Sequence, residues 1–95
     1  MRNYETIFVL KPNLEEEARN EMIEKFKSII ADAGEVESVE EWGIRRLAYE
    51  IDKIREGYYV LVRFRSNPEL PKELERNYKI ADEVMRYIVI NLDEK

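Results

Sequence analysis

The chain contains no cysteine and no histidine among its 95 residues. Without cysteine it cannot form a disulfide, a thiolate zinc site or a cysteine nucleophile, and without histidine it lacks the commonest general base and metal ligand. It has no run of the roughly 20 apolar residues that a membrane span requires, and its first residues lack a signal-peptide pattern. These absences exclude chemistry based on histidine or a thiol. They predict a cytoplasmic chain that uses no membrane, cofactor or metal.

The remaining residues offer little support for an enzyme. The three serines have no histidine to activate them, and the three glycines never cluster into a loop that could cradle a phosphate. Glu40 and Glu41 are adjacent in an extended segment, so they point to opposite faces and cannot act on one substrate as an acid and base pair. We therefore predict that the chain is not an enzyme and has no small-molecule substrate.

The composition is that of a folded domain. Apolar residues make up 44% of the chain and aromatic residues 11%, which is too many for a disordered acidic tail. A chain of this length buries roughly 60 to 70% of its unfolded surface, enough for one core. We predict that residues 1–95 form a single domain.

Hydrophobic periodicity predicts two helices and four strands. In chain order we expect a strand over 4–10, a helix over 14–33, an extended segment over 36–51, a polar hairpin connection over 52–57, a strand over 58–65, a short helix containing Leu70, Leu74 and Tyr78, and a strand over 84–92. This order is typical of an α+β, ferredoxin-like split βαβ fold (βαββαβ). It implies a four-stranded antiparallel sheet in the order 4-1-3-2, with two helices on one face and the other face open.

Several local features carry more detailed expectations. Asn13 and Glu16 resemble a capping box before the first helix, and Gly34 fits the left-handed residue after its end. Apolar residues change parity along the segment 36–51, which predicts a bulge within 43–46. In the last strand we expect Val84 to share a face with Ile88.

Two further expectations concern the side chains around that bulge. Arg45 and Arg46 should project together from its irregular backbone. Trp42 is expected to pack at the edge of the core, as a lone tryptophan usually does, and the alternative is that its ring is a stacking platform for RNA.

The formal net charge of −5 is unevenly distributed along the chain. Residues 15–41 carry three basic and ten acidic side chains, whereas residues 42–65 carry six basic and three acidic ones among several aromatic rings. Cations for phosphates and flat rings for unstacked bases are what an RNA surface needs. Arg63 and Arg65 also fit a simpler interpretation, in which they are solvated and paired with neighbouring carboxylates.

Five segments resemble one known family along nearly the whole chain. They are residues 1–5 (MRNYE), 11–14 (KPNL), 42–49 (WGIRRLAY), 56–59 (EGYY) and 84–87 (VMRY). In this order and spacing they look like the sixth protein of the bacterial small ribosomal subunit. The segment 43–49 is the most specific of them.

The resemblance implies a βαββαβ domain that binds the central domain of small-subunit ribosomal RNA as a pair with the eighteenth protein of the small subunit. The basic residues that approach RNA in the family correspond here to Arg2, Arg45, Arg46, Lys79 and Arg86. The chain departs from the family at Asn3, Ala81 and Met85, where relatives often carry further bases. Its RNA contact area is therefore expected to be smaller.

Two alternatives remain open from the residues alone. An RNA-recognition-motif protein would stack single-stranded bases on its central strands, and residues 7–14 and 57–60 faintly resemble its two motifs. A protein-only adaptor would use an edge strand or the open face, with its acidic first helix addressing a basic protein.

Overall fold

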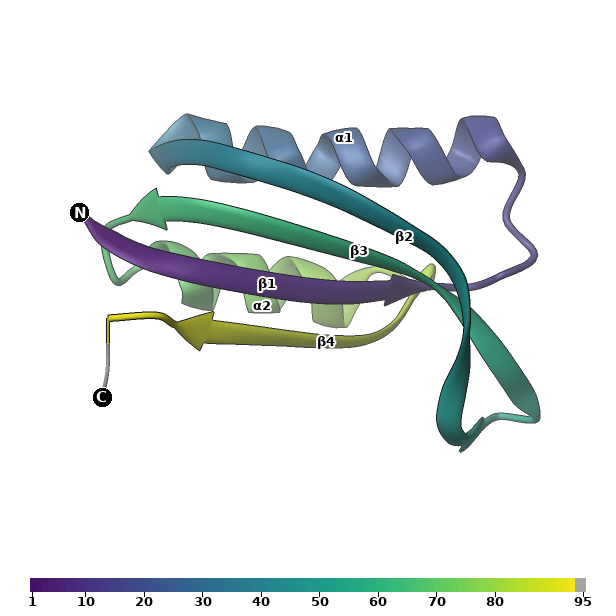
Figure 1. Ribbon diagram of the computed structural model, residues 1–95. Helices are drawn as coiled ribbons and strands as arrows, with labels where there is room; N and C mark the ends of the chain where they lie inside the picture. The colour runs from purple at the N-terminus through teal and green to yellow at the C-terminus, as the bar shows by residue number, and fades with distance from the viewer. Residues whose placement is uncertain (94–95) are drawn as a thin grey trace.

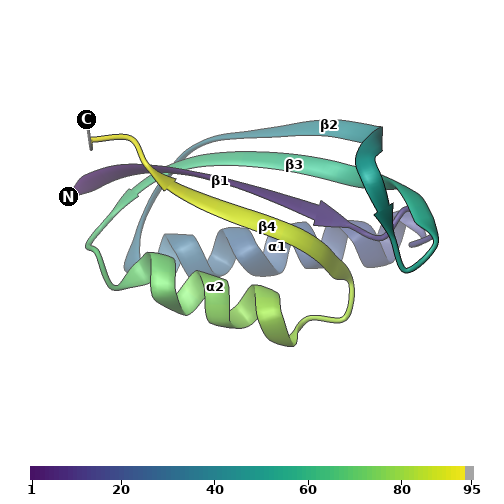
Figure 2. The same ribbon diagram turned by 90° about the horizontal axis from the view of Figure 1, so that it is seen from below.

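The computed structural model describes residues 1–93 and contains one sheet and two helices (Figure 1). The elements in chain order are β1 (Arg2–Leu10), α1 (Glu16–Ala33), β2 (Gly34–Ile51), β3 (Ile54–Ser66), α2 (Leu70–Ile80) and β4 (Val84–Asn91). Neighbouring strands are antiparallel in the order β2-β3-β1-β4. Both helices cover the same face of the sheet (Figure 2). The predicted fold class, strand order and placement of the helices are confirmed.

The core lies between the sheet and the two helices. Alternate residues of the two central strands point into it, so that Tyr4 pairs with Phe64 and Phe8 pairs with Val60. The helices contribute Met22, Ile23, Phe26, Ile30, Leu70, Leu74 and Tyr78. These residues recur at steps of three and four, which is the spacing of a buried helical stripe. Because one face of β1 and β3 is used in this way, their other residues lie on the opposite face of the sheet.

The ends of α1 differ from the expectation. The helix begins at Glu16, and no side chain caps its first turn, so the predicted capping box does not form. Gly34 has φ −168° and is extended rather than left-handed. Glycine is needed at this position because there is no space for a side chain. A Cβ here would overlap the carbonyl oxygen of Arg65 and approach Ser66.

The β2-β3 hairpin contains several irregularities. Its register with β3 shifts between Val36 and Ser38, between Glu41 and Gly43, and between Arg46 and Ile51. The second shift lies at the start of the predicted bulge, where Gly43 has φ +80°. The connection is shorter than predicted, since only Asp52 and Lys53 form the turn, with φ 48° and 67°.

The prediction that Val84, the first residue of β4, shares a face with Ile88 is wrong. The β1-β4 register shifts between Val9 and Leu10, which pair with Arg86 and Val84, so Met85 is the extra residue. Val84 therefore packs against the core together with Tyr87 and Val89. Ile88 lies on the other face and is 50% exposed.

A polar contact is buried where α2 crosses the sheet. The Thr6 hydroxyl donates to the carbonyl oxygen of Ile88 at 2.9 Å and lies 3.0 Å from the Tyr78 hydroxyl. A hydroxyl has one proton to donate, so Tyr78 donates to Thr6. The contact links β1, β4 and α2, and both side chains are buried.

Thr6→Val is expected to lower the free energy of unfolding by about 1 to 3 kcal/mol, because the Tyr78 hydroxyl is left buried without its acceptor. Tyr78→Phe should cost only about 1 kcal/mol, since it leaves no orphaned donor. Adding Tyr78→Phe to Thr6→Val should therefore recover stability. Urea unfolding of the three variants tests this, and additive losses would contradict it.

Stability should also fall at alkaline pH. Burial raises the pKa of Tyr78 well above the ordinary value of 10.0. Above pH 10 the unfolded chain releases this proton while the folded chain retains it, so unfolding becomes more favourable as the pH rises. Thermal midpoints between pH 8 and 11 should decline less in Tyr78→Phe than in the control Tyr49→Phe, whose ring is exposed.

Candidate nucleic-acid interface

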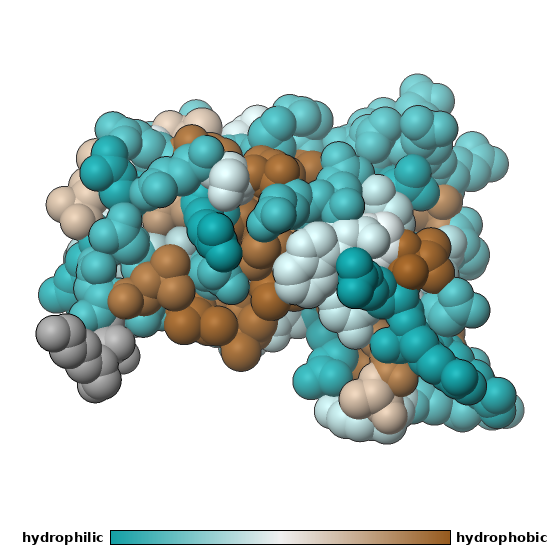
Figure 3. Space-filling model, viewed as in Figure 1, coloured by the Kyte–Doolittle hydropathy of each residue, from teal (hydrophilic) through white to brown (hydrophobic). Residues whose placement is uncertain are grey.

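The face of the sheet opposite the helices is not covered by any element within residues 1–93. We call it the open face, and it points toward the viewer in Figures 1 and 3. Its members are the residues that alternate with the core positions: Glu5, Ile7 and Val9 of β1, Tyr59, Leu61, Arg63 and Arg65 of β3, and Arg86, Ile88 and Ile90 of β4. Figure 3 shows an apolar band crossing this face, with pale and strongly hydrophilic side chains beside it toward the hairpin.

The half of the open face near the start of β1 is neutralised by ion pairs. Arg63 lies 3.2 Å from a carboxylate oxygen of Glu5, and Arg65 contacts both Glu35 and Glu37. The hydrogen bond and the charge of Glu35 raise the pKa of Arg65 further above its ordinary range. The interpretation of both arginines as surface residues paired with carboxylates is confirmed.

The other half carries arginines that lie on aromatic rings. Trp42 and Tyr59 are stacked with ring centroids 6.4 Å apart and an angle of 15° between their planes. The guanidinium of Arg45 lies 5.4 Å from the centre of the Trp42 ring. That of Arg86 lies 5.2 Å from the centre of the Tyr49 ring. We call these five residues the aromatic cluster.

The position of Trp42 corrects the expectation that it packs at the core edge. The register shift between Glu41 and Gly43 makes Trp42 an extra residue of β2. Its ring contacts Tyr59 of the open face, and 39% of its surface is exposed. An added residue changes the face of the sheet to which the neighbouring side chains point. A prediction that assumes regular alternation along the strand does not include this change.

The far end of the hairpin brings Tyr49 to Arg86. These residues belong to β2 and β4, which form the two edges of the sheet. Figure 1 shows how this is possible, because the hairpin bends past the end of β1. Tyr49 lies within the third register shift, between Arg46 and Ile51. Tyr49 is 61% exposed, so its ring remains accessible.

The structure brings some of the predicted site residues together and leaves others apart. Arg45 and Arg86 both belong to the aromatic cluster, where each lies over a different ring. Arg46 pairs in regular register with Glu56, so it points away from Arg45 rather than projecting together with it. Lys79 lies at the end of α2 and lines a cavity of about 250 Å³ with Lys11, a cation that sequence reasoning did not single out.

Arg2 lies apart from the other four predicted residues. It begins β1, whereas Arg86 pairs with Val9 near the end of that strand. At about 3.3 Å per residue, this separation is roughly 23 Å. A ligand that contacts Arg2 as well as the cluster must therefore span the length of the sheet.

All five predicted residues share one electrostatic property. Within residues 1–93, none of them forms an ion pair, whereas Arg55, Arg63, Arg65 and Arg76 each lie within 4 Å of a carboxylate. Cations without a carboxylate partner can bind an external anion without first breaking an ion pair.

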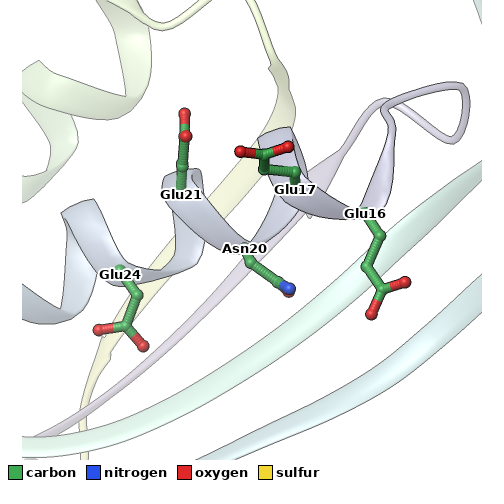
Figure 4. A pocket seen from close by; sticks show the side chains of 5 residues that line it. All are labelled: Glu16, Glu17, Asn20, Glu21 and Glu24. Atoms are coloured by element: carbon green, nitrogen blue, oxygen red, sulfur yellow. The ribbon is translucent and has the colours of Figure 1, made fainter.

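The acidic side chains of α1 lie on the helix side of the sheet. Figure 4 shows the carboxylates of Glu16, Glu17, Glu21 and Glu24 around the first turns, and they point in different directions rather than toward one centre. No group of three or more potential metal ligands occurs in the described part of the chain. The sheet therefore separates this negative charge from the open face.

No helix within residues 1–93 is long and apolar enough to cross a membrane.

Comparison with known proteins gives one consistent result. The family model described as ribosomal protein S6 matches residues 3–91. The small ribosomal subunit protein bS6 of Clostridium novyi is 59% identical over 92 residues, which cover 96% of this chain and 97% of the relative. That of Alkaliphilus oremlandii is 55% identical over 94 residues, covering 99% and 100%. The crystal structure of 30S ribosomal protein S6 from Thermotoga maritima superposes with a TM-score of 0.90 at 37% identity, covering 95% of this chain and 86% of the other.

The two halves of the open face are expected to differ in affinity for a polyanion. The double variant Arg45→Gln with Arg86→Gln should elute from immobilised heparin at lower salt than the unmodified chain, because it loses two unpaired cations. Arg63→Gln with Arg65→Gln removes the same charge but affects arginines already paired with glutamates, so its elution should shift much less. Equal shifts for the two variants would show that pairing does not distinguish them.

Proposed function

Because this chain belongs to the ribosomal protein S6 family, we propose that it binds the central domain of small-subunit ribosomal RNA together with the eighteenth protein of that subunit. The family consists of structural proteins of the small ribosomal subunit and is not a family of enzymes. The chain is accordingly part of the cytoplasmic ribosome of bacteria. The finer assignment to one RNA domain and one protein partner is the proposal.

The observation that carries the RNA part is the set of unpaired cations. Arg45, Arg46, Lys79 and Arg86 lie toward the same end of the sheet, and Arg2 lies at the other end. Phosphate contacts from a few such cations can bind RNA even when the whole chain is acidic, because salt screens interactions beyond roughly 10 Å. The acidic turns of α1 lie on the helix side, away from the open face.

The protein part is supported by exposed apolar side chains near β4. Ile88, Ile90 and Leu92 are 50%, 39% and 48% exposed. A cluster of exposed apolar side chains on a small chain is typical of a surface that another protein covers. A basic partner would also complement the formal net charge of −5.

Arg45→Gln with Arg46→Gln is expected to weaken binding to a transcript of the central RNA domain. Each lost phosphate contact should change the slope of log affinity against log salt by about one, so the double variant should change it by about two. Filter binding over a salt series, with and without the basic partner, measures this. Lys25→Gln with Lys72→Gln, on α1 and α2, is the matched control, since it removes the same charge from two exposed lysines on the helix side.

Several outcomes would contradict the proposal. An unchanged salt slope would remove the role of the arginine pair. Equal affinity for the transcript and for short single-stranded oligonucleotides would favour an RNA-recognition-motif protein. Binding of the basic partner with no effect on RNA assembly would favour a protein-only adaptor.

A further inference from the structure

We infer that the aromatic cluster is a binding site for one unstacked RNA base, which stacks on Trp42 and Tyr59 while Arg45 and Arg86 contact the adjacent phosphates. The inference rests on the proposed function and adds a recognition step to it. Phosphate contacts alone position a protein on RNA, whereas contact with an extruded base depends on the local RNA structure.

The first argument is the geometry of the two rings. Trp42 and Tyr59 are nearly parallel, at 15°, and come from neighbouring strands of the sheet. Trp42 is 39% exposed, so part of the indole surface is accessible to a ligand. A sheet that displays flat, accessible rings is the arrangement on which single-stranded bases stack in RNA-binding domains.

The second argument is the state of the two arginines. Within the described chain, Arg45 and Arg86 lie over aromatic rings and form no ion pair with a carboxylate. An exposed contact of this kind is worth only about 0.5 to 1 kcal/mol. Both guanidinium groups can therefore move from ring to phosphate at small cost, and the Trp42 ring face that Arg45 leaves can accept a base.

The third argument is the surface beside Tyr59. A depression of about 230 Å³ is lined by Tyr59 and Arg86 together with the apolar side chains of Ile7, Val9 and Ile88. It offers apolar contact for a base edge and a cation at its rim. The charge around it favours RNA over an acidic protein segment, since a nucleotide supplies both a flat ring and a phosphate for Arg45 or Arg86.

The chain's only tryptophan provides a direct probe of this site. The full chain is titrated with the central-domain transcript while Trp42 fluorescence is recorded, and affinities are measured for Trp42→Leu and Trp42→Phe. A base stacked on the indole should quench its emission. Trp42→Leu should weaken transcript binding about tenfold, within the range for loss of one stacked base, and Trp42→Phe should restore most of it.

The salt dependence separates stacking from phosphate contact. Trp42→Leu removes no charge, so its salt slope should equal that of the unmodified chain, whereas Arg45→Gln should change the slope by about one. Thermal unfolding by circular dichroism verifies that each variant is folded, which the exposed position of Trp42 favours.

The possible failures are distinguishable. If the unmodified chain does not bind the transcript, with or without the basic partner, the proposed function fails. If it binds but Trp42→Leu retains full affinity and the emission is unquenched, the base site is wrong and the proposed function stands. If Trp42→Leu weakens only the binding of the basic protein, the cluster is a protein interface and the base site is again overturned.

Discussion

The register shift between Glu41 and Gly43 in β2 is the constraint on which the functional face depends. One extra residue there turns Trp42 onto Tyr59, and it leaves Arg45 above the indole ring. Beyond the shift the hairpin bends, so that Tyr49 of one edge strand reaches Arg86 of the other. Without the irregularity, alternation along β2 would direct these side chains differently, because a shift of one residue exchanges the two faces of a strand.

The sheet separates the acidic first turns of α1 from the open face. The open face is itself divided into two halves that differ in how their arginines are paired. Near the start of β1, glutamates neutralise Arg63 and Arg65. Near the hairpin, aromatic rings hold Arg45 and Arg86 in place of carboxylates. Exposed ion pairs contribute little to stability. Their consequence here is that, among the arginines of the open face within residues 1–93, only Arg45 and Arg86 near the hairpin are without a carboxylate partner.

Sequence reasoning was most accurate where side chains repeat. Leu70, Leu74 and Tyr78 follow a simple period, and all three are buried on α2, the helix that their spacing predicts. Errors occurred where the period is interrupted: Trp42 was assigned to the core edge, Val84 to the wrong face, and Gly34 to a left-handed conformation. Each of these three features depends on a neighbouring strand. Trp42 and Val84 depend on a register shift, and Gly34 depends on the lack of space beside β3. The local pattern of residues contains no information about either.

The sequence by itself determined the order of helices and strands, the face each helix buries, and the absence of histidine and thiol chemistry. These properties depend on residue type and local spacing. Only the tertiary structure decided which cations are paired, that Arg45 and Arg86 share a face while Arg46 points away, and that Arg2 lies at the far end of the sheet. The physical reason is that these relations arise between strands distant in the chain, where register and twist, rather than periodicity, bring side chains together.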